Sequence, residues 1–295
     1  MSYIGRQLNL PASTVQLTAE GAITAGKPCI VEADGDGAQV AEIPISQSAG
    51  TAALFESAAV RYVSAAYDSN AQKVVIAYTD DGNSSYGTAV VGTVSGDSIS
   101  FGTPVVFESA STLHISITYD SNAQKVVMSY NDFNNSQKGT CIVGTVSGTS
   151  ISFGSATAFE SGITADTAIA YDANAQKVVV AYRDTEDSNH GKAIVGTVSG
   201  TSISFGPTAT FESASTEDGT IAIVYDSNAQ KVVIAYKDGG NSNYGTAIVG
   251  TVSGTSISYG TAAVFESAYS WEIAAAYDAS AQKVVIAYQD NPNSA

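Results

Sequence analysis

One stretch of sequence occurs five times in this chain at an almost constant spacing. Each copy opens on a Tyr-Asp pair, as in YDSNAQKVVIAY, and the tripeptide FES precedes each copy. The opening tyrosines are Tyr67, Tyr119, Tyr171, Tyr225 and Tyr277, so successive copies are 52, 52, 54 and 52 residues apart. A fixed period of this length predicts a repeat architecture, in which each copy is one supersecondary unit that packs on its neighbours.

Each copy has the pattern of four short β-strands. In the first copy, residues 60–67, 73–78, 86–94 and 98–107 are rich in β-forming residues and are separated by DSNAQ, TDDGNSS and SGD. Such short connections favour antiparallel, up-and-down strands, whereas a solenoid, the alternative, usually has parallel strands and wider turns. Four antiparallel strands in about 52 residues are typical of a β-propeller blade.

The two ends of the repeat region look like halves of one further blade. The last copy stops after its second strand, and residues 25–54 repeat the second half of a copy, with Cys29-Ile-Val in the place of Cys141-Ile-Val. We therefore predict an all-β, five-bladed β-propeller over residues 25–295, with a ring closed by half-blades from both termini, since closure removes open sheet edges. Cys29 and Cys141 would then occupy the same place in different blades and remain unbonded.

Residues 1–24 lie outside the repeats and form a predicted N-terminal arm. The alternation in LNLPASTVQL suits strand addition to another protein, so we favour an arm that becomes ordered on a partner. The alternative is a disordered tail.

Composition narrows the possible partners. The chain is 44% hydrophobic, which is enough for a core, and carries a net charge of −16, which disfavours nucleic acid. It has no apolar run long enough for a membrane span, and its start lacks the basic and apolar regions of a secretory signal. We therefore expect no membrane insertion and synthesis in a cytoplasm without export.

The sequence gives little support for catalysis, a cofactor or a metal. The two histidines, His114 and His190, occupy non-equivalent positions, and no catalytic triad order, HExxH or P-loop motif is present. Carboxylates recur in every copy, as in the sets that begin with Asp68 and Asp80, so we interpret them as acceptors in turns and caps. Two alternatives remain: a weak divalent-cation site at DDGN, residues 80–83, and an acid pair found in one copy only, Glu186-Asp187 or Glu217-Asp218.

Comparison of the five copies separates two faces. The first and third connections barely change, whereas the second and fourth vary freely, and in an up-and-down blade these two pairs lie at opposite ends. Aromatic side chains beside Asn and Asp suit sugar binding, so we predict a ligand-binding variable face. Its candidate residues are Tyr62, Asp80, Asp81, Asn83, His114, Phe133, His190 and Trp271. The alternative is that these loops vary because nothing depends on them.

The tyrosines have a mainly structural interpretation. Ten of the 16 tyrosines open or close the first hairpin of a copy, as Tyr67 and Tyr78 do. We expect these paired tyrosines to pack between blades rather than to form a ligand ladder.

The repeat also resembles a known group of sequences. YDxNAQKVVIAYxD followed by GTAIVGTVSGTSISFG is similar to a repeat of virion structural and tail-fibre-like proteins of bacteriophages, especially aquatic ones, over about residues 25–295. GAITAGKPCIVEADGDGAQV, from Gly21, resembles the opening segment of such proteins. At the level of architecture, the chain is similar to five-bladed lectins of the tachylectin type.

The resemblance implies a non-enzymatic virion protein, present in many copies on the particle. Its N-terminal arm would dock to other virion proteins, and its variable face would attach to host-surface glycans. The alternative is a capsid or tail decoration protein with no ligand. A glycan-degrading enzyme is a third hypothesis.

Overall fold

The computed structural model describes residues 29–31, 37–39, 50–216, 219 and 221–291, and the chain divides into two compact units, residues 1–49 and 50–295. The first unit contains an antiparallel pair, β1 (Cys29–Val31) and β2 (Gly37–Gln39), with Cys29 opposite Gln39. This pairing agrees with the hairpin expected there.

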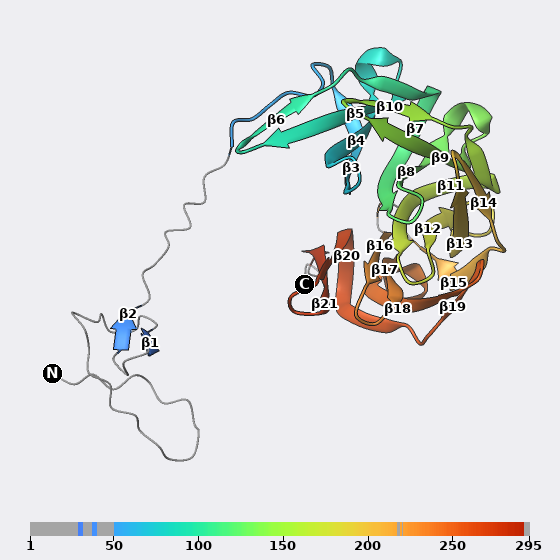
Figure 1. Cartoon of the computed structure of the whole chain (residues 1–295). Helices are drawn as coiled ribbons and strands as arrows, with labels where there is room; N and C mark the ends of the chain where they lie inside the picture. The colour runs from blue at the N-terminus through green and yellow to red at the C-terminus, as the bar shows by residue number, and fades with distance from the viewer. Residues whose placement is uncertain (1–28, 32–36, 40–49, 217–218, 220, 292–295) are drawn as a thin grey trace. The chain divides into compact units, whose positions relative to one another are not determined.

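The second unit contains four successive four-stranded antiparallel meanders, which we call blades 1 to 4 (Figure 1). Blade 1 contains β3 (Val60–Asp68), β4 (Lys73–Asp80) and β5 (Tyr86–Ser95). Its fourth strand has two segments that both pair with β5, namely β6 (Ser98–Phe101) and the start of β7 (Val105–Asp120), and the other blades follow this pattern. Blade 2 contains the rest of β7, β8 (Lys125–Asp132), β9 (Lys138–Ser147), β10 (Ser150–Phe153) and the start of β11 (Thr157–Asp172).

The later blades follow the same order. Blade 3 contains the rest of β11, β12 (Lys177–Asp184), β13 (His190–Ser199), β14 (Ser202–Phe205) and β15 (Ala209–Ser215). Blade 4 contains β16 (Ala222–Asp226), β17 (Lys231–Asp238), β18 (Tyr244–Ser253), β19 (Ser256–Tyr259) and the start of β20 (Ala263–Asp278). The rest of β20 pairs with β21 (Lys283–Asn291). Three 3-10 helices, η1 (Asp81–Asn83), η2 (Phe133–Asn135) and η3 (Gly239–Asn241), follow β4, β8 and β17.

The predicted strands and their antiparallel order are thus confirmed, and the solenoid alternative is wrong, because all the strand pairings of the described residues are antiparallel. The first strands of consecutive blades contact one another, β3 with β7, β7 with β11, β11 with β16 and β16 with β20. Figure 1 shows the blades following one another along an arc with these strands on its inner side.

The passage from one blade to the next differs from the prediction. The sequence predicted a loop after FES, but β7 continues from its pairing with β5 at Ser111 to its pairing with β8 at Thr112. The predicted fourth strand, residues 98–107, is instead split by residues 102–104. Pro104 has no N–H to donate to a strand pairing. A Cβ atom at Gly102 would collide with the carbonyl oxygen of Thr149 in blade 2, so glycine at this position allows the two blades to approach closely.

The FES tripeptide joins adjacent blades. Phe107, in the outer strand of blade 1, packs on Tyr130 of blade 2 with ring centroids 5.3 Å apart, and the Tyr130 hydroxyl donates to Glu108 at 3.2 Å. The same arrangement recurs as Phe159, Glu160 and Tyr182, and as Phe211, Glu212 and Tyr236. These three closing tyrosines are fully buried, which confirms their predicted place between blades, whereas for Tyr67, which is 57% exposed, that prediction is wrong.

The opposite end of the blades has its own contacts. Asp120 accepts hydrogen bonds from the backbone N–H groups of Asn122 and Ala123, which fixes the first turn. The hydroxyl of Tyr171, the opening tyrosine of the next copy, accepts a further hydrogen bond from Asn122 N at 3.3 Å. The turn role predicted for the repeated aspartates is therefore confirmed, and Asp68, Asp172, Asp226 and Asp278 act in the same way.

The hydrophobic core lies between blades rather than within a single blade. One cluster joins Val75 and Ala77 of blade 1 to Val126 and Met128 of blade 2, and two further clusters join blades 2 and 3 and blades 3 and 4. Each blade therefore depends on its neighbour for burial of its apolar face.

The five-blade count and the closed ring stay predictions. The described part of the C-terminal unit ends in two strands, β20 and β21, and most of the half-blade expected in residues 25–54 lies outside the described residues. The predicted arm, residues 1–24, also lies outside them.

The interblade contact predicts the effect of truncating its phenylalanine. Phe159→Ala should lower the free energy of unfolding by about 3–5 kcal/mol, because Phe159 is buried against Tyr182 and Phe205. The matched control is Phe133→Ala, at a half-exposed phenylalanine, which should change stability by less than about 0.5 kcal/mol. Urea unfolding measures both, and equal effects would contradict the proposed packing.

Burial also predicts the reactivity of Cys141. This free cysteine is fully inaccessible, and burial raises the pKa of its thiol, so the reactive thiolate is scarce. In a Cys29→Ser variant, a thiol reagent should label Cys141 only after denaturant unfolds the protein. Rapid labelling of the native protein would contradict this burial.

Candidate functional site

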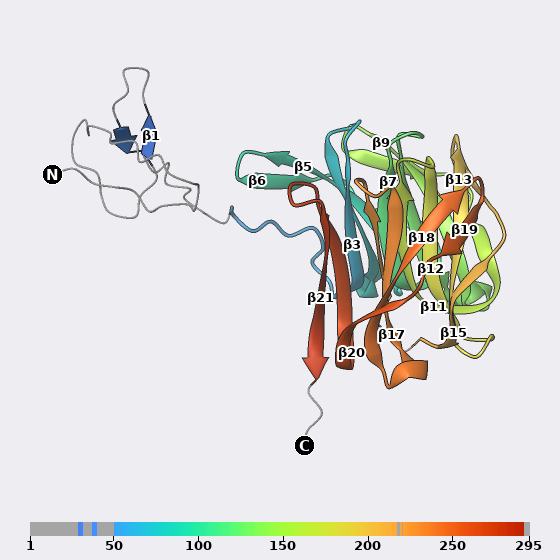
Figure 2. The same ribbon diagram turned by 90° about the horizontal axis from the view of Figure 1, so that it is seen from below.

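The variable connections lie at one end of the blades. Asp80, before the second connection, pairs with Tyr86, which in turn pairs with Ser111. In Figure 2, the orange turn of η3 and the end of β21 lie at this same, lower end. The separation into a uniform and a variable end is therefore confirmed for the described blades.

At the variable end, the first strands of blades 1, 2 and 3 and the strand β20 share a bulge with an unusual backbone. Tyr62, His114, Asp166 and Glu272 each lie five residues before the opening tyrosine of their copy, and their φ angles are 49°, 51°, 51° and 46°. Positive φ is uncommon for residues other than glycine. The backbone geometry is the same at these four positions while the side chain differs, so the strand structure alone does not determine the residue type here.

Four side chains from this region form what we call the axial cluster: Tyr62, His114, Asp166 and Arg183. The rings of Tyr62 and His114 lie 5.0 Å apart, which links blade 1 to blade 2. His114 Nδ1 lies 3.3 Å from Asp166 Oδ1, and Arg183 Nε lies 3.1 Å from Asp166 Oδ2. Asp166 Oδ1 also accepts a hydrogen bond from Gly219 N at 2.9 Å. The cluster therefore joins side chains of three blades and the backbone of a fourth.

Burial differs sharply within the axial cluster. The Asp166 side chain is only 2% exposed, and a buried carboxylate requires charged or hydrogen-bonding partners of the kind that His114 and Arg183 supply. Tyr62, in contrast, is 38% exposed. The axial cluster therefore presents the Tyr62 ring to solvent, beside the buried contacts of Asp166 with His114 and Arg183.

Trp271 lies in a different environment. The ammonium of Lys237 lies 3.7 Å from the centroid of the Trp271 ring and 4.4 Å from that of Tyr269, and it donates to the Tyr269 hydroxyl at 3.1 Å. Lys237 is fully buried, so this is a cation–π contact between blade 4 and the strand β20. One face of Trp271 is therefore occupied by the protein itself.

Sequence reasoning missed Lys237, Asp166 and Arg183. For Lys237 and Arg183 the sequence did contain a signal. The residue directly before the aspartate that opens the second connection differs in every copy, although its neighbours repeat. These residues are Thr79, Asn131, Arg183, Lys237 and Gln289.

The candidate binding residues in the first variable loop mainly form intramolecular contacts. Asp80 caps η1 by accepting from Asn83 N at 3.1 Å. Asp81 forms an ion pair with Arg61 at 2.7 Å, and this guanidinium holds the pKa of Asp81 below its ordinary value. Asp132 and Asp238 cap η2 and η3 in the same manner, so the cap role predicted for this set is confirmed there. Among the residues that the structure describes, no three side chains are grouped as a metal site would require.

The remaining candidates lie apart from the axial cluster. Phe133 is half-exposed on η2, and His190 Nδ1 lies 3.4 Å from Asp187 Oδ2 in blade 3. Lys192 donates to Asp187, and this bond holds the pKa of Asp187 below its ordinary value, whereas a general acid needs a raised pKa. Glu217 and Asp218 lie outside the described residues. Of the predicted residues in separate loops, the structure brings only Tyr62 and His114 together.

No protein-family model matches the sequence, and no curated protein matches it either. A protein of unknown function from Dyadobacter fermentans DSM 18053 shares its fold, with a TM-score of 0.52, 12% identity, and coverage of 78% of this chain and 74% of that one. In the described residues, no helix is long and apolar enough to cross a membrane.

Two further solved structures are less similar, with TM-scores below 0.5. The lectin SapL1, solved with alpha methyl fucoside, has a TM-score of 0.48 at 14% identity, covering 77% of this chain and 71% of that one. Trypanosoma rangeli sialidase, solved with sialic acid, has a TM-score of 0.47 at 11% identity, covering 79% of this chain but only 43% of that one.

The Lys192 contact predicts a measurable pKa change. Lys192→Met removes the hydrogen bond that lowers the pKa of Asp187, so this pKa should rise towards the ordinary value of about 3.9. Carbon-detected NMR titration of the carboxylates measures it. Lys177→Met, which removes a cation from the uniform end of the same blade, should leave the Asp187 pKa unchanged, and an equal shift in both variants would contradict the local pairing.

Proposed function

We propose that this chain is a non-enzymatic attachment protein that binds glycans through its variable face, with the axial cluster as the principal contact. The observation that carries the proposal is the shared bulge, where one strained backbone geometry presents Tyr62, His114 and Asp166 from successive blades. Strained positions of this kind concentrate at functional sites.

The chemistry of the axial cluster suits a sugar. The half-exposed Tyr62 ring offers an apolar face for the C–H surface of a pyranose, and its hydroxyl offers a hydrogen bond. Asp166 fixes the His114 imidazole beside that ring, so the contact is preorganised and little side-chain entropy is lost on binding. Arg183 Nε lies 3.1 Å from Asp166 Oδ2 and so gives this buried carboxylate a charged partner.

We further propose that the protein is displayed in many copies on a bacteriophage particle, with residues 1–24 as the docking arm. This setting rests on the resemblance of its repeat to virion and tail-fibre-like proteins. Many copies on one particle would convert weak single contacts into strong attachment through avidity.

Binding to immobilised glycans and to host-cell envelopes tests the glycan proposal. The full-length protein should bind saturably, and Tyr62→Ala should weaken binding about tenfold or more, since about 1.4 kcal/mol corresponds to a factor of ten. The matched control is Tyr67→Ala, which removes an exposed tyrosine at the uniform end and should leave binding unchanged. No binding to any glycan or envelope would replace this proposal with a decoration role.

The display proposal has a separate test. Deletion of residues 1–24 should prevent incorporation into particles while leaving the urea unfolding midpoint of the remaining chain unchanged. Normal incorporation of the shortened protein would contradict the docking role of the arm.

A further inference from the structure

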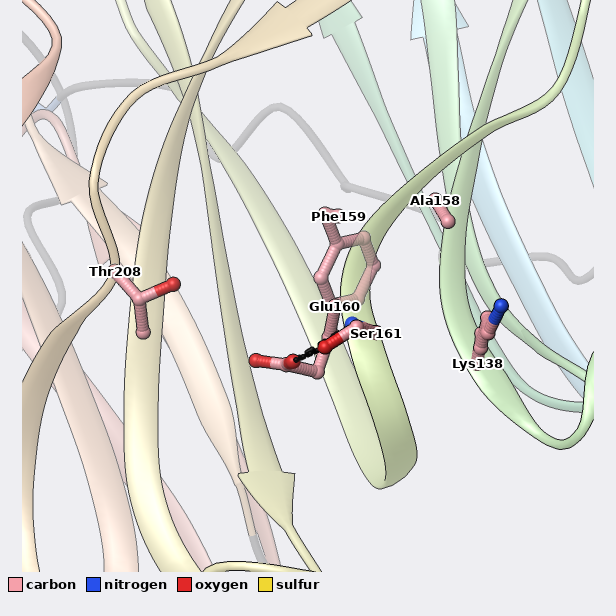
Figure 3. A pocket seen from close by; sticks show the side chains of 6 residues that line it. All are labelled: Lys138, Ala158, Phe159, Glu160, Ser161 and Thr208. Carbon is pink, nitrogen blue, oxygen red and sulfur yellow. Dashed lines mark hydrogen bonds between the residues drawn. The ribbon is translucent and has the colours of Figure 1, made fainter.

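A hollow lies away from the axial cluster, at the junction of blades 2 and 3. It has a volume of about 390 Å³, within the range of small-molecule sites, and Figure 3 shows the six side chains around it. They are Lys138, Ala158, Phe159, Glu160, Ser161 and Thr208. Lys138 opens β9, residues 158–161 belong to the start of β11, and Thr208 lies between β14 and β15; none of them is part of the axial cluster.

Three of these residues differ from their equivalents at the other junctions. The equivalents of Lys138 are Tyr86, His190 and Tyr244, those of Ala158 are Val106, Thr210 and Val264, and those of Thr208 are Ala156 and Ala262. Lys138 replaces a ring with a flexible cation, and Ala158 replaces a larger side chain. Thr208 adds a hydroxyl. All three changes therefore enlarge the hollow or add a polar group, although the surrounding FES framework is unchanged.

The framework holds one carboxylate in a fixed orientation. Glu160 Oε1 accepts from Ser161 N at 2.7 Å and from Ser161 Oγ at 3.1 Å, while Oε2 accepts from the Tyr182 hydroxyl at 2.9 Å. Burial raises the pKa of Tyr182, so its hydroxyl remains protonated and continues to donate. In the view of Figure 3, the Glu160 carboxylate extends towards Thr208, and Lys138 lies on the other side of Phe159.

Among the described residues, Lys138 has no acidic partner for its ammonium. Lys138 is half-buried, and its ammonium forms no ion pair within the described part of the chain, not even with Glu160. Lys192, in contrast, pairs with both Asp184 and Asp187. In a protein of net charge −16, an unpaired ammonium beside a hollow favours a ligand with a negative group at that side.

We propose that this hollow binds an acidic monosaccharide unit, a pyranose that carries one carboxylate. The ligand carboxylate would pair with Lys138, and its hydroxyls would donate to Glu160 and exchange hydrogen bonds with Ser161 and Thr208. The fixed Glu160 carboxylate disfavours phosphates and other multiply charged anions because of like-charge repulsion. This site extends the proposed glycan binding but does not depend on the axial cluster.

Ligand-observed NMR titration of the full-length protein tests the site, with D-glucuronate and D-galacturonate as probes. At least one of them should bind saturably with one site per chain, and D-glucose and acetate should bind at least about tenfold more weakly. Failure of both acidic sugars to exceed acetate would overturn the proposal, and that result would leave the axial cluster untested rather than refuted.

Residues borrowed from the other blades give matched variants. Lys138→Tyr combined with Ala158→Val reproduces the residues of blade 1 and should abolish acidic-sugar binding without changing the urea unfolding midpoint. Lys125→Gln, which removes a cation at the uniform end, should leave it intact. Binding that survives the double variant, or is lost in the Lys125→Gln control, would contradict the assignment.

The repeat also allows a gain-of-function test. Tyr86→Lys, Val106→Ala and Ala156→Thr together install the same three residues at the junction of blades 1 and 2. The stoichiometry of the acidic sugar should then rise from one to two per chain. An unchanged stoichiometry in a variant with a wild-type unfolding midpoint would show that these three residues do not make the site.

Discussion

The contact on which this fold depends is the Phe-Glu-Tyr junction between neighbouring blades. A phenylalanine from the outer strand of one blade lies against a fully buried tyrosine of the next, whose hydroxyl donates to the adjacent glutamate. Because the ring needs space, a glycine stands at the start of the third strand, and a Cβ atom at Gly139 would collide with Phe159. Many of the residues that repeat in every copy therefore serve this junction.

The repeated polar residues are therefore little available for binding a ligand, because they already form hydrogen bonds within the protein. The repeated aspartates fix turns and 3-10 helices, and the repeated glutamates hold tyrosine hydroxyls. Functional chemistry can enter only where the framework is indifferent to residue type. The bulge of the first strand and the start of the third strand are two such places, and they provide the axial cluster and the hollow at the junction of blades 2 and 3.

The sequence was sufficient for the strand order, the two faces and the interblade tyrosines, because these follow from local turn chemistry and from the repeat itself. It was not sufficient for the continuous strand β7 or the positive φ of His114, since no local residue pattern marks either of them. Trp271 looked exposed among polar residues, yet its partner Lys237 lies 34 residues earlier in the sequence and in another blade. Contacts between copies have no sequence signature when each partner occurs only once.

The unbroken strands β7, β11 and β20 have a consequence for how the protein bears load. Each of them is at once the outer strand of one blade and the inner strand of the next. There is no slack linker between such blades, so tension on the chain would shear paired strands in two blades together rather than peel one blade away. The mechanical unit is thus a pair of neighbouring blades, and a force applied to one blade would be shared with the next.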